Sequence, residues 1–300
     1  MKIAIFGGDT AGRSIDDVVA DARAAEADGF ASYALPQIFA LDAMGVLAVV
    51  GREVPRISLE TGVVPTYGRH PLTMAQQALT VQAASGGRFV LGIGLSHQLV
   101  IEGMFGLSFD KPVRHMREYL SVLMPLLTEG KASFKGETIS TEVAIGVEPR
   151  LTCPVVVAAL GTQMLKLAGA VADGTVTWMT GPATLSEHTV PVITAAATAA
   201  GRPAPRVVAS LPVCVTNDID QARQRAAKDF QVYGFLPSYR AMLDREGAKG
   251  PADVAMVGDE AAVERQVRAL ADAGVTEYVA SIFGARDERE RTRALLKSML

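Results

Sequence analysis

Residues 61–97 decide the fold, and they read TGVVPTYGRHPLTMAQQALTVQAASGGRFVLGIGLSH. The run 57–64 is rich in β-branched residues but contains Gly62, which is typical of a buried strand with a bulge or a close backbone approach. Pro71 then opens a run of apolar residues at helical spacing, and a pair of glycines ends it. A second apolar strand follows over 89–94. A strand, a helix and a strand within this length predict a parallel β-α-β crossover.

The same alternation continues along the chain. Eight strand-like runs alternate with helical patterns, which favours a closed parallel barrel over an open sheet. We therefore predict a single (β/α)8 TIM-barrel domain over residues 1–300. The strands are expected at 2–6, 31–35, 57–64, 89–94, 154–158, 174–178, 206–213 and 276–281. The helices are expected at 14–28, 40–51, 71–85, 115–128, 162–172, 186–200, 219–233, 260–273 and 287–298.

Two gaps are too long for simple crossovers and predict insertions after strands four and seven. Residues 95–153 hold a loop, a helix and a polar segment over 131–151, and residues 214–275 hold two helical patterns and a Gly/Pro-rich link. Insertions in barrels usually build the substrate pocket or an oligomer interface. We expect pocket walls from 95–115 and 232–258. Their aromatic residues, which favour an apolar or aromatic substrate, are Phe105, Phe109, Tyr233, Phe235 and Tyr239.

The composition is that of an ordinary globular protein, with 49% hydrophobic residues, 20% charged residues and a net charge of −3. No cluster of lysine and arginine indicates nucleic-acid binding. No signal peptide and no apolar run of membrane-spanning length is present, so we expect no membrane association and a cytoplasmic location. Cys153 and Cys214 are expected to be reduced thiols. The histidines lack metal-ligand spacing, so no metal site is predicted.

Several motifs, taken in order, resemble the luciferase-like oxidoreductase superfamily, and more narrowly its actinobacterial branch that uses the deazaflavin coenzyme F420. They are Gly-Val-x-Pro and Arg-His-Pro within 62–71, Ser-Gly-Gly-Arg-Phe-x-Leu-Gly-Ile-Gly over 85–94, the segments 155–161 and 172–179, and Gly-Phe-Leu-Pro-Ser-Tyr-Arg over 234–240. The resemblance covers essentially the whole chain. Each motif alone is weakly specific for the family. Their order and spacing together are a strong signal.

The resemblance implies a cofactor site at the carboxyl ends of the strands. In the F420 branch, the residue pair that matches Gly62 and Val63 forms a non-proline cis peptide against the central ring of the cofactor, and the same is implied here. Free amides at the start of the helix after Gly161 can hold a phosphate, and Thr162 could cap that helix or bind the phosphate. The cofactor contacts we predict are Gly62, Val63, Gly94, Leu95, Ser96, Ala158, Ala159, Leu160, Gly161, Thr162, Gly174, Thr175 and Trp178.

Two residues are candidates for the catalytic chemistry. His97 either faces the substrate as a proton donor or is a hydrogen-bonded loop histidine. Gln37 ends strand two, where related deazaflavin enzymes carry an acidic residue or a histidine. A glutamine orients a substrate but does not readily transfer protons, so this departure argues against sugar-phosphate dehydrogenase chemistry. The remaining polar residues near these strands are expected to be structural: His70 caps a helix, Arg69 pairs with a carboxylate, and His115 and His188 lie at the surface.

The leading functional prediction is an oxidoreductase that transfers a hydride between coenzyme F420 and a small organic substrate. In such enzymes the cofactor carries the difficult step and the protein orients its reactive carbon. Two alternatives stay open: a luciferase-like monooxygenase that uses FMN, and a non-catalytic protein that binds a flavin or deazaflavin. A homodimer is expected by analogy with the family alone.

Overall fold

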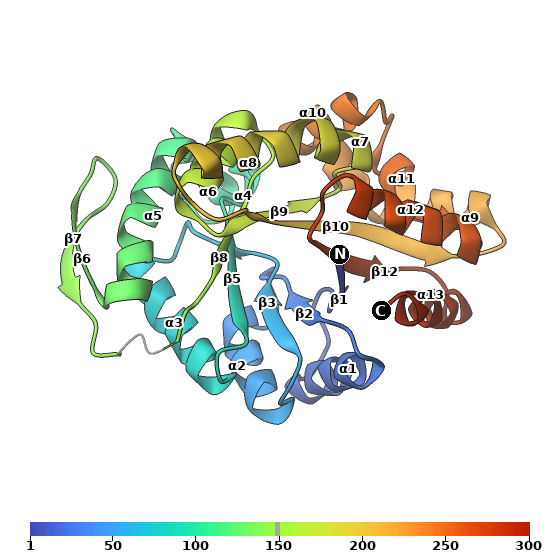
Figure 1. Cartoon of the computed structure of the whole chain (residues 1–300), viewed down its shortest axis with the longest axis horizontal. Coiled ribbons are helices and arrows are strands. Elements are labelled where there is room, and N and C mark those ends of the chain that lie inside the picture. The colour runs from blue at the N-terminus through green and yellow to red at the C-terminus, as the bar shows by residue number, and fades with distance from the viewer. Residues whose placement is uncertain (148–150) are drawn as a thin grey trace.

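Eight parallel strands close into a barrel in this computed structural model, which describes residues 1–147 and 151–300 (Figure 1). The order β1, β2, β3, β5, β8, β9, β10, β12 returns to β1, because β12 pairs with both β10 and β1. The predicted (β/α)8 TIM barrel is therefore confirmed. Its strands are β1 (Lys2–Phe6), β2 (Ser32–Leu35), β3 (Ser58–Thr61), β5 (Phe89–Gly94), β8 (Val155–Ala158), β9 (Gly174–Trp178), β10 (Arg206–Val215) and β12 (Glu277–Ile282).

Helices connect the strands around the outside of the barrel (Figure 1). Their ends follow local chemistry: Ser14 and Asp17 form a capping box at the start of α1, and Gly29 ends that helix in the left-handed region. The helices are α1 (Ile15–Asp28), α2 (Ala43–Glu53), α3 (Pro71–Ala84), α5 (Pro112–Glu129), α6 (Thr162–Val171), α7 (Pro182–Thr184), the π-helical turn η1 (Leu185–Thr189), α8 (Val190–Ala199), α9 (Ile219–Asp229), α12 (Glu260–Asp272) and α13 (Arg286–Ser298).

The predicted strand over 57–64 is split in two. It forms β3 and a short strand β4 (Val64–Pro65), and both pair with β5. The Gly62–Val63 peptide between them is cis, as the sequence resemblance implied. Below the break, Thr61 Oγ1 donates to the carbonyl of Gly92 and accepts from its amide, both at 2.8 Å. This reciprocal pair joins the two strands where regular pairing stops.

The insertion after the fourth barrel strand contains structure that the sequence did not predict. It starts with α4 (Gln98–Gly103) and ends in an antiparallel hairpin, β6 (Lys131–Lys135) and β7 (Ser140–Ala144). The hairpin stands out from the barrel at the left of Figure 1. Its polar sequence hid the strands, because only one face of each strand is even partly buried. Residues 148–150 of the predicted polar segment lie outside the described residues.

The insertion after the seventh barrel strand is hydrogen-bonded into the sheet. Strand β10 runs two residues beyond its predicted end, and β11 (Met256–Gly258) pairs in parallel with its last residues. The lower part of β10 pairs instead with β9. Between β10 and β11 lie α9, the 3-10 turn η2 (Gln231–Gly234), α10 (Pro237–Glu246) and α11 (Pro251–Val254).

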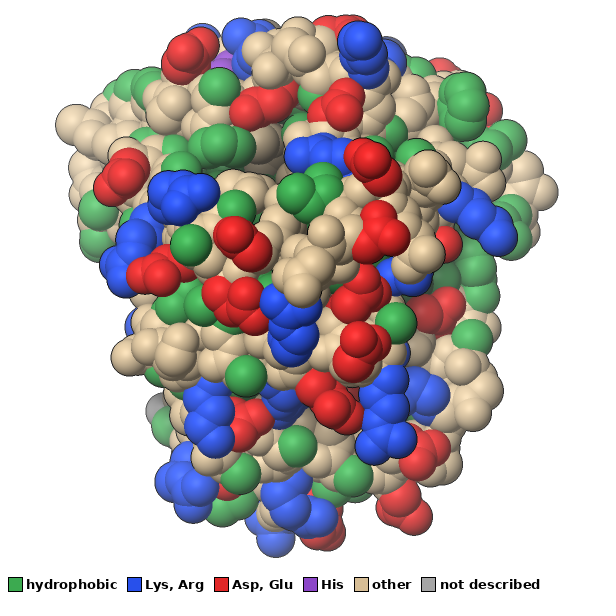
Figure 2. Space-filling view, turned by 90° about the vertical axis from the view of Figure 1, so that its right-hand side faces the viewer, with side chains coloured by type: hydrophobic (Ala, Val, Ile, Leu, Met, Phe, Trp, Pro, Cys, Tyr) green, Lys and Arg blue, Asp and Glu red, His purple; other side chains and the backbone are tan. Residues whose placement is uncertain are grey.

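The face that carries α9, α12 and α13 is covered by interspersed acidic and basic side chains (Figure 2). Many are paired: Arg291 contacts Glu260 between the last two helices, and Arg268 pairs with Glu264 on α12. The face therefore offers no continuous basic stripe of the kind that follows a nucleic-acid backbone. Among the described helices, none is long and apolar enough to cross a membrane.

Candidate functional site

Three of the predicted cofactor residues meet at the carboxyl ends of neighbouring strands. A Cβ placed on Gly94 would lie 2.8 Å from Cγ2 of Val63 and 3.1 Å from Cβ of Ala158. Only a glycine fits there, because real Cβ contacts are almost never this short. Val63, Gly94 and Ala158 therefore form one continuous arc on the rim of the barrel. A Cβ on Gly92 would collide with the carbonyl oxygen of Thr61. This glycine therefore lets two strands pack closely and does not make room for a ligand.

A row of aromatic rings crosses the mouth of the barrel beside this arc. The rings of His97, Tyr239, Tyr233, Trp178 and Phe6 follow one another with successive centroid distances of 5.7, 5.0, 5.7 and 5.9 Å. We call these five residues the aromatic belt. It links the end of β5 to the end of β1 through η2 and α10 of the second insertion. The insertion is thereby held over the rim by ring contacts, which stabilise beyond the area that they bury.

The aromatic belt comes close to the arc at Gly62, the residue before Val63. A Cβ built on this glycine would lie 3.8 Å from Cε2 of Phe6, whose ring stacks on Trp178. Gly62 and Trp178, both predicted as cofactor contacts, therefore lie on the same side of the mouth. Sequence reasoning missed Phe6 in this role, and also Phe230, which packs edge-on against Trp178. An aromatic residue at the end of a barrel strand was the signal that could have identified Phe6.

The loop after β5 carries three of the predicted residues. Leu95, Ser96 and His97 are all half-buried. Ser96 lies in the left-handed region at φ 60°, and Met179, which follows β9 at the same rim, has φ 54°. Such conformations are uncommon outside glycine and gather at functional sites. Burial lowers the pKa of His97 below 6.5, so its imidazole is neutral at pH 7.

The loop between β8 and α6 places the predicted phosphate-binding residues. Ala159 is buried, and the carbonyl of Leu160 lies 2.9 Å from Nε2 of His188. Gly161 is the N-cap of α6, and Thr162 is its first residue, so the prediction that Thr162 caps the helix is wrong. Both are exposed, and no side chain among the described residues caps the helix. The first amides of α6 are therefore free to bind an anion.

Two predicted contacts lie elsewhere. Gly174 begins β9 and is buried, and a Cβ on it would lie 2.1 Å from the carbonyl of Arg206. Thr175 is fully buried, and its hydroxyl donates to the carbonyl of Val157 at 2.8 Å. Both are next to the amino end of a strand, away from the rim. Their surroundings favour a packing role, and their contact with a cofactor stays a prediction.

Gln37 lies at the end of β2, as expected, but its amide group is engaged. Its Oε1 accepts from the amide of Ala43 at 2.8 Å, and its Nε2 donates to the carbonyl of Ile38 at 3.3 Å. The first bond satisfies a free donor at the start of α2. The structure thus gives Gln37 a local structural role, and its catalytic role stays a prediction.

The structural expectations for the other polar residues had mixed outcomes. His70 caps α3 by accepting from the amide of Leu72, and Arg69 pairs with Asp42, as predicted. The surface positions predicted for His115 and His188 were wrong. His188 is buried, and His115 is half-buried with Nε2 3.1 Å from the hydroxyl of Thr66. The sequence around a histidine in a helix does not show whether it faces solvent or protein when the fold of the neighbouring insertion is unknown.

The amino-acid sequence of this chain is similar to those of several known proteins. The chain is similar to a 5,10-methylenetetrahydromethanopterin reductase of Methanolobus tindarius, with 28% identity over 260 residues that cover 86% of this chain and 78% of that protein. It is also similar to an F420-dependent glucose-6-phosphate dehydrogenase of Nakamurella multipartita, with 28% identity over 228 residues and coverage of 73% and 65%. An uncharacterised protein of Mycobacterium tuberculosis is 28% identical over 216 residues, and the chain spans 64% of its length.

Solved structures share the fold over nearly their whole length. The coenzyme F420-dependent tetrahydromethanopterin reductase of Methanopyrus kandleri superposes with a TM-score of 0.81 at 23% identity, covering 99% of this chain and 97% of that one. A type II Baeyer–Villiger monooxygenase of Pseudomonas putida in complex with FMN gives 0.77 at 16% identity, covering 99% and 96%. At these identities the likeness establishes the fold alone. A family model described as luciferase-like monooxygenase matches residues 1–288, so the chain belongs to the luciferase-like monooxygenase family.

Proposed function

We propose that this protein is an oxidoreductase that transfers a hydride between coenzyme F420 and a small organic substrate. The observation that carries the proposal is the rim arc, in which Gly94 is enclosed by Val63 and Ala158 while the start of α6 nearby is left uncapped. Relatives named as F420-dependent enzymes support the deazaflavin as cofactor.

The residues at the start of α6 fit a phosphate-bearing cofactor. Gly161 is exposed, and a Cβ on it would have no heavy atom within 4 Å, so the protein leaves open space beside this backbone. No lysine is needed there, because free helix amides and the helix dipole attract anions. Gly161 and Thr162 would hold the phosphodiester, and Val63, Gly94, Leu95, Ser96 and Ala158 would hold the ring system.

Bound coenzyme F420 supplies hydride chemistry, and the chain's own residues position the reactants and handle the proton. In this proposal His97, which is half-buried at the rim, delivers a proton to the substrate. Burial raises the pKa of both Tyr233 and Tyr239, so these hydroxyls stay protonated near neutral pH and can each donate a hydrogen bond. The aromatic belt keeps water from one side of the mouth, which strengthens the polar contacts made inside it.

A cofactor titration tests the proposal. Purified protein is titrated with oxidised F420 and, separately, with FMN, and binding is followed by absorbance. The Gly161→Ala variant should fold normally, because its added methyl meets open space, yet bind F420 at least tenfold more weakly. Gly146→Ala, two residues beyond the end of β7, is the matched control, since its Cβ also meets open space. Equal affinity in both variants would refute the assignment at α6.

The same titration separates the alternatives. Saturable FMN binding with rapid oxygen consumption, and no F420 binding, identifies a flavin monooxygenase, which a solved FMN complex of the same fold makes the second candidate. Tight F420 binding without turnover of enones, imines or alcohols identifies a non-catalytic carrier.

We also expect a homodimer. Helix α3 carries no charged residue from Pro71 to Ala84, although Thr73, Gln76 and Thr80 face solvent. In a chain with 20% charged residues, such a face favours a protein contact. Light scattering should therefore give a mass of twice 31.6 kDa.

A further inference from the structure

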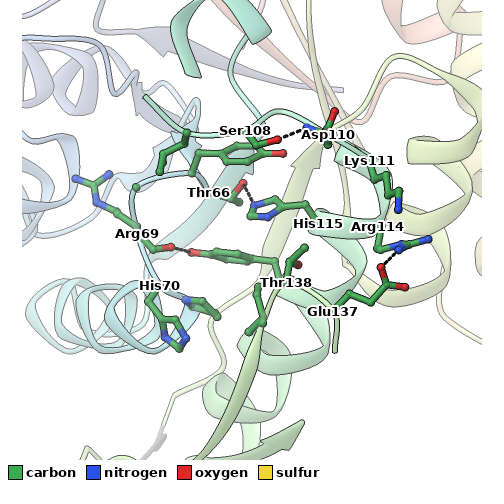
Figure 3. Close-up of a pocket in the computed structure, with 16 residues that line it drawn as sticks. Thr66, Arg69, His70, Ser108, Asp110, Lys111, Arg114, His115, Glu137 and Thr138 are labelled. Atoms are coloured by element: carbon green, nitrogen blue, oxygen red, sulfur yellow. Dashed lines mark hydrogen bonds and ion pairs between the residues drawn. The ribbon is translucent and has the colours of Figure 1, made fainter. Parts of the chain in front are cut away.

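A cavity of about 670 Å³ lies outside the arc and the aromatic belt (Figure 3). It is lined by residues from 66–71, 107–111, the first turns of α5 and the hairpin tip at 137–139, and we call it the α3–α5 pocket. None of these residues belongs to the arc or the aromatic belt. The volume is within the range of small-molecule sites, which is roughly 300–1,000 Å³.

Two long helices begin at this pocket. Arg69, His70 and Pro71 line it at the start of α3, and Lys111 and Arg114 line it at the start of α5. Within residues 1–147 and 151–300, no side chain caps helix α5, whose first residue is Pro112. The amide of His115 bonds the carbonyl of Lys111, so the two amides between them have no helix carbonyl to reach. Both helix dipoles present their positive ends to the same space.

Charged side chains surround the pocket. Figure 3 shows Arg69, Lys111 and Arg114 around it, with Asp110 and Glu137 as the acidic members. Glu137 is neutralised by its ion pair with Arg114. Lys111 has no carboxylate partner among the residues that the structure describes. Arg69 is likewise neutralised by its ion pair with Asp42, so the charged lining residues without an ion pair in the described part of the chain are Lys111 and Asp110.

A buried hydroxyl in the lining has no partner. The Tyr67 side chain lines the pocket and is 8% exposed, and its hydroxyl makes no hydrogen bond within the described part of the chain. Its ring is fixed by stacking on His115 at a centroid distance of 4.0 Å. An unpaired buried hydroxyl is unfavourable, and an acceptor atom of a ligand would satisfy it.

From this geometry we propose that the α3–α5 pocket binds a phosphate group, either free or as the monoester of a small organic molecule. The amides at the start of α5, the ammonium of Lys111 and the hydroxyl of Tyr67 donate to the phosphate oxygens. The room beyond one phosphate favours the monoester. This site is separate from the deazaflavin site and does not depend on it.

Calorimetric titration with inorganic phosphate and with glycerol 3-phosphate tests the proposal, with sodium chloride holding the ionic strength constant. Two variants probe the donors. Lys111→Asn removes the charge while keeping a residue that tolerates the left-handed φ of 50° at this position. Tyr67→Phe removes only the hydroxyl. Lys228→Asn, an exposed lysine in the last turn of α9, is the matched control.

The wild type should bind at least one probe saturably, Lys111→Asn about tenfold more weakly and Tyr67→Phe about fivefold more weakly, while Lys228→Asn stays unchanged. The Tm of Tyr67→Phe should not fall, because no existing bond is lost. Tighter binding of glycerol 3-phosphate assigns the site to a monoester, and tighter binding of phosphate to the free anion. No saturable binding of either probe, or affinities of both variants within twofold of the wild type, would overturn the proposal. F420 affinity, measured in the same variants, should stay constant and so separates this result from the rim site.

Discussion

Nη2 of Arg206 lies 2.9 Å from Oε1 of Glu60, across the base of the barrel. The same nitrogen lies 2.7 Å from Oε2 of Glu277, whose other oxygen accepts from Ser32 at 2.6 Å. The two carboxylates are 5% and 3% exposed, and they come from strands on opposite sides of β1 and β2. One guanidinium thus joins three barrel strands at the end opposite the candidate site.

Replacing Arg206 by methionine should destabilise the protein strongly. Two buried carboxylates would lose their counter-ion, and breaking a buried ion pair in this way costs about 3 kcal/mol or more. Chemical denaturation followed by circular dichroism measures the loss. The exposed pair of Arg286 and Glu290 provides the control, since Arg286→Met should change stability by less than about 0.5 kcal/mol. A small loss of stability in Arg206→Met would mean that water solvates the carboxylates of Glu60 and Glu277 at the base of the barrel.

Stability should fall as the pH rises through the titration of Glu60. Burial, followed by the neighbouring Glu277, raises the pKa of Glu60 to about 7 from 4.5. Between these values the folded state holds a proton that the unfolded state has released, so unfolding becomes easier with increasing pH. The slope should approach about 1 kcal/mol per pH unit. Urea unfolding at pH 5, 6 and 7 measures it, and Glu60→Gln should flatten the profile. An identical slope in that variant would assign the effect elsewhere.

Replacing Glu118 by glutamine should loosen the β6–β7 hairpin but not the barrel. Its carboxylate accepts from the amides of Glu137, Thr138 and Ile139 and from the hydroxyl of Thr138. Although burial opposes it, these bonds lower the pKa of Glu118 to about 2, so the tie holds above pH 4.5 and is lost as the pH falls towards 2.

Hydrogen exchange measures this effect. Amides over 131–144 should exchange about tenfold faster in Glu118→Gln, while those of β1 and β2 keep their protection. Faster exchange across the whole chain would instead show that the hairpin and barrel unfold together.

Trp178 should report cofactor binding by itself. It is the only tryptophan in the chain, and it stands in the aromatic belt beside Phe6 and Gly62. A deazaflavin bound against the arc should quench its emission in a saturable manner with one site per chain. Trp178→Phe should bind with similar affinity by absorbance yet lose the fluorescence signal. Binding seen by absorbance without any quenching would place the cofactor away from the belt.

His97→Gln should slow turnover about 100-fold while leaving the Kd for F420 within twofold, because proton delivery by a positioned histidine contributes roughly 10²–10⁴-fold. Because burial lowers the pKa of His97, its protonated form becomes abundant only at a pH below the usual range of a histidine. The rate of carbonyl reduction should therefore rise as the pH falls, and the variant should lack this limb. A wild-type rate in His97→Gln would mean that a tyrosine or solvent donates the proton to the substrate.

Much of the barrel could be predicted from local patterns. Each of its strands is a short apolar run followed by turn residues, and Pro71 and the glycines after the helices marked boundaries that the structure keeps. The hairpin over 131–144 escaped prediction because its burial depends on Glu118, twenty residues away in sequence from Thr138. A contact of that kind leaves no periodic trace in either segment.

Some residues of the candidate site could also be predicted from the sequence, and others could not. Glycines such as Gly62 and Gly94 could be identified because a missing side chain in a strand requires a reason. Gly174 shows the limit of that argument, since the reason there is the carbonyl of Arg206 and not a ligand. The aromatic belt depends on how the second insertion folds back over the mouth, and no pattern within residues 214–275 specifies that direction.

Strand β10 pairs with β9 along its lower part and with β11 at its upper end. Cutting out residues 216–275 would therefore strip the top of β10 of its neighbour and expose a row of unpaired amides and carbonyls, which invites edge-to-edge aggregation. Chimeras that exchange this segment between relatives should carry β11 with it and place their junctions at Thr216 and Asp259, so that the grafted piece brings its own partner for the sheet.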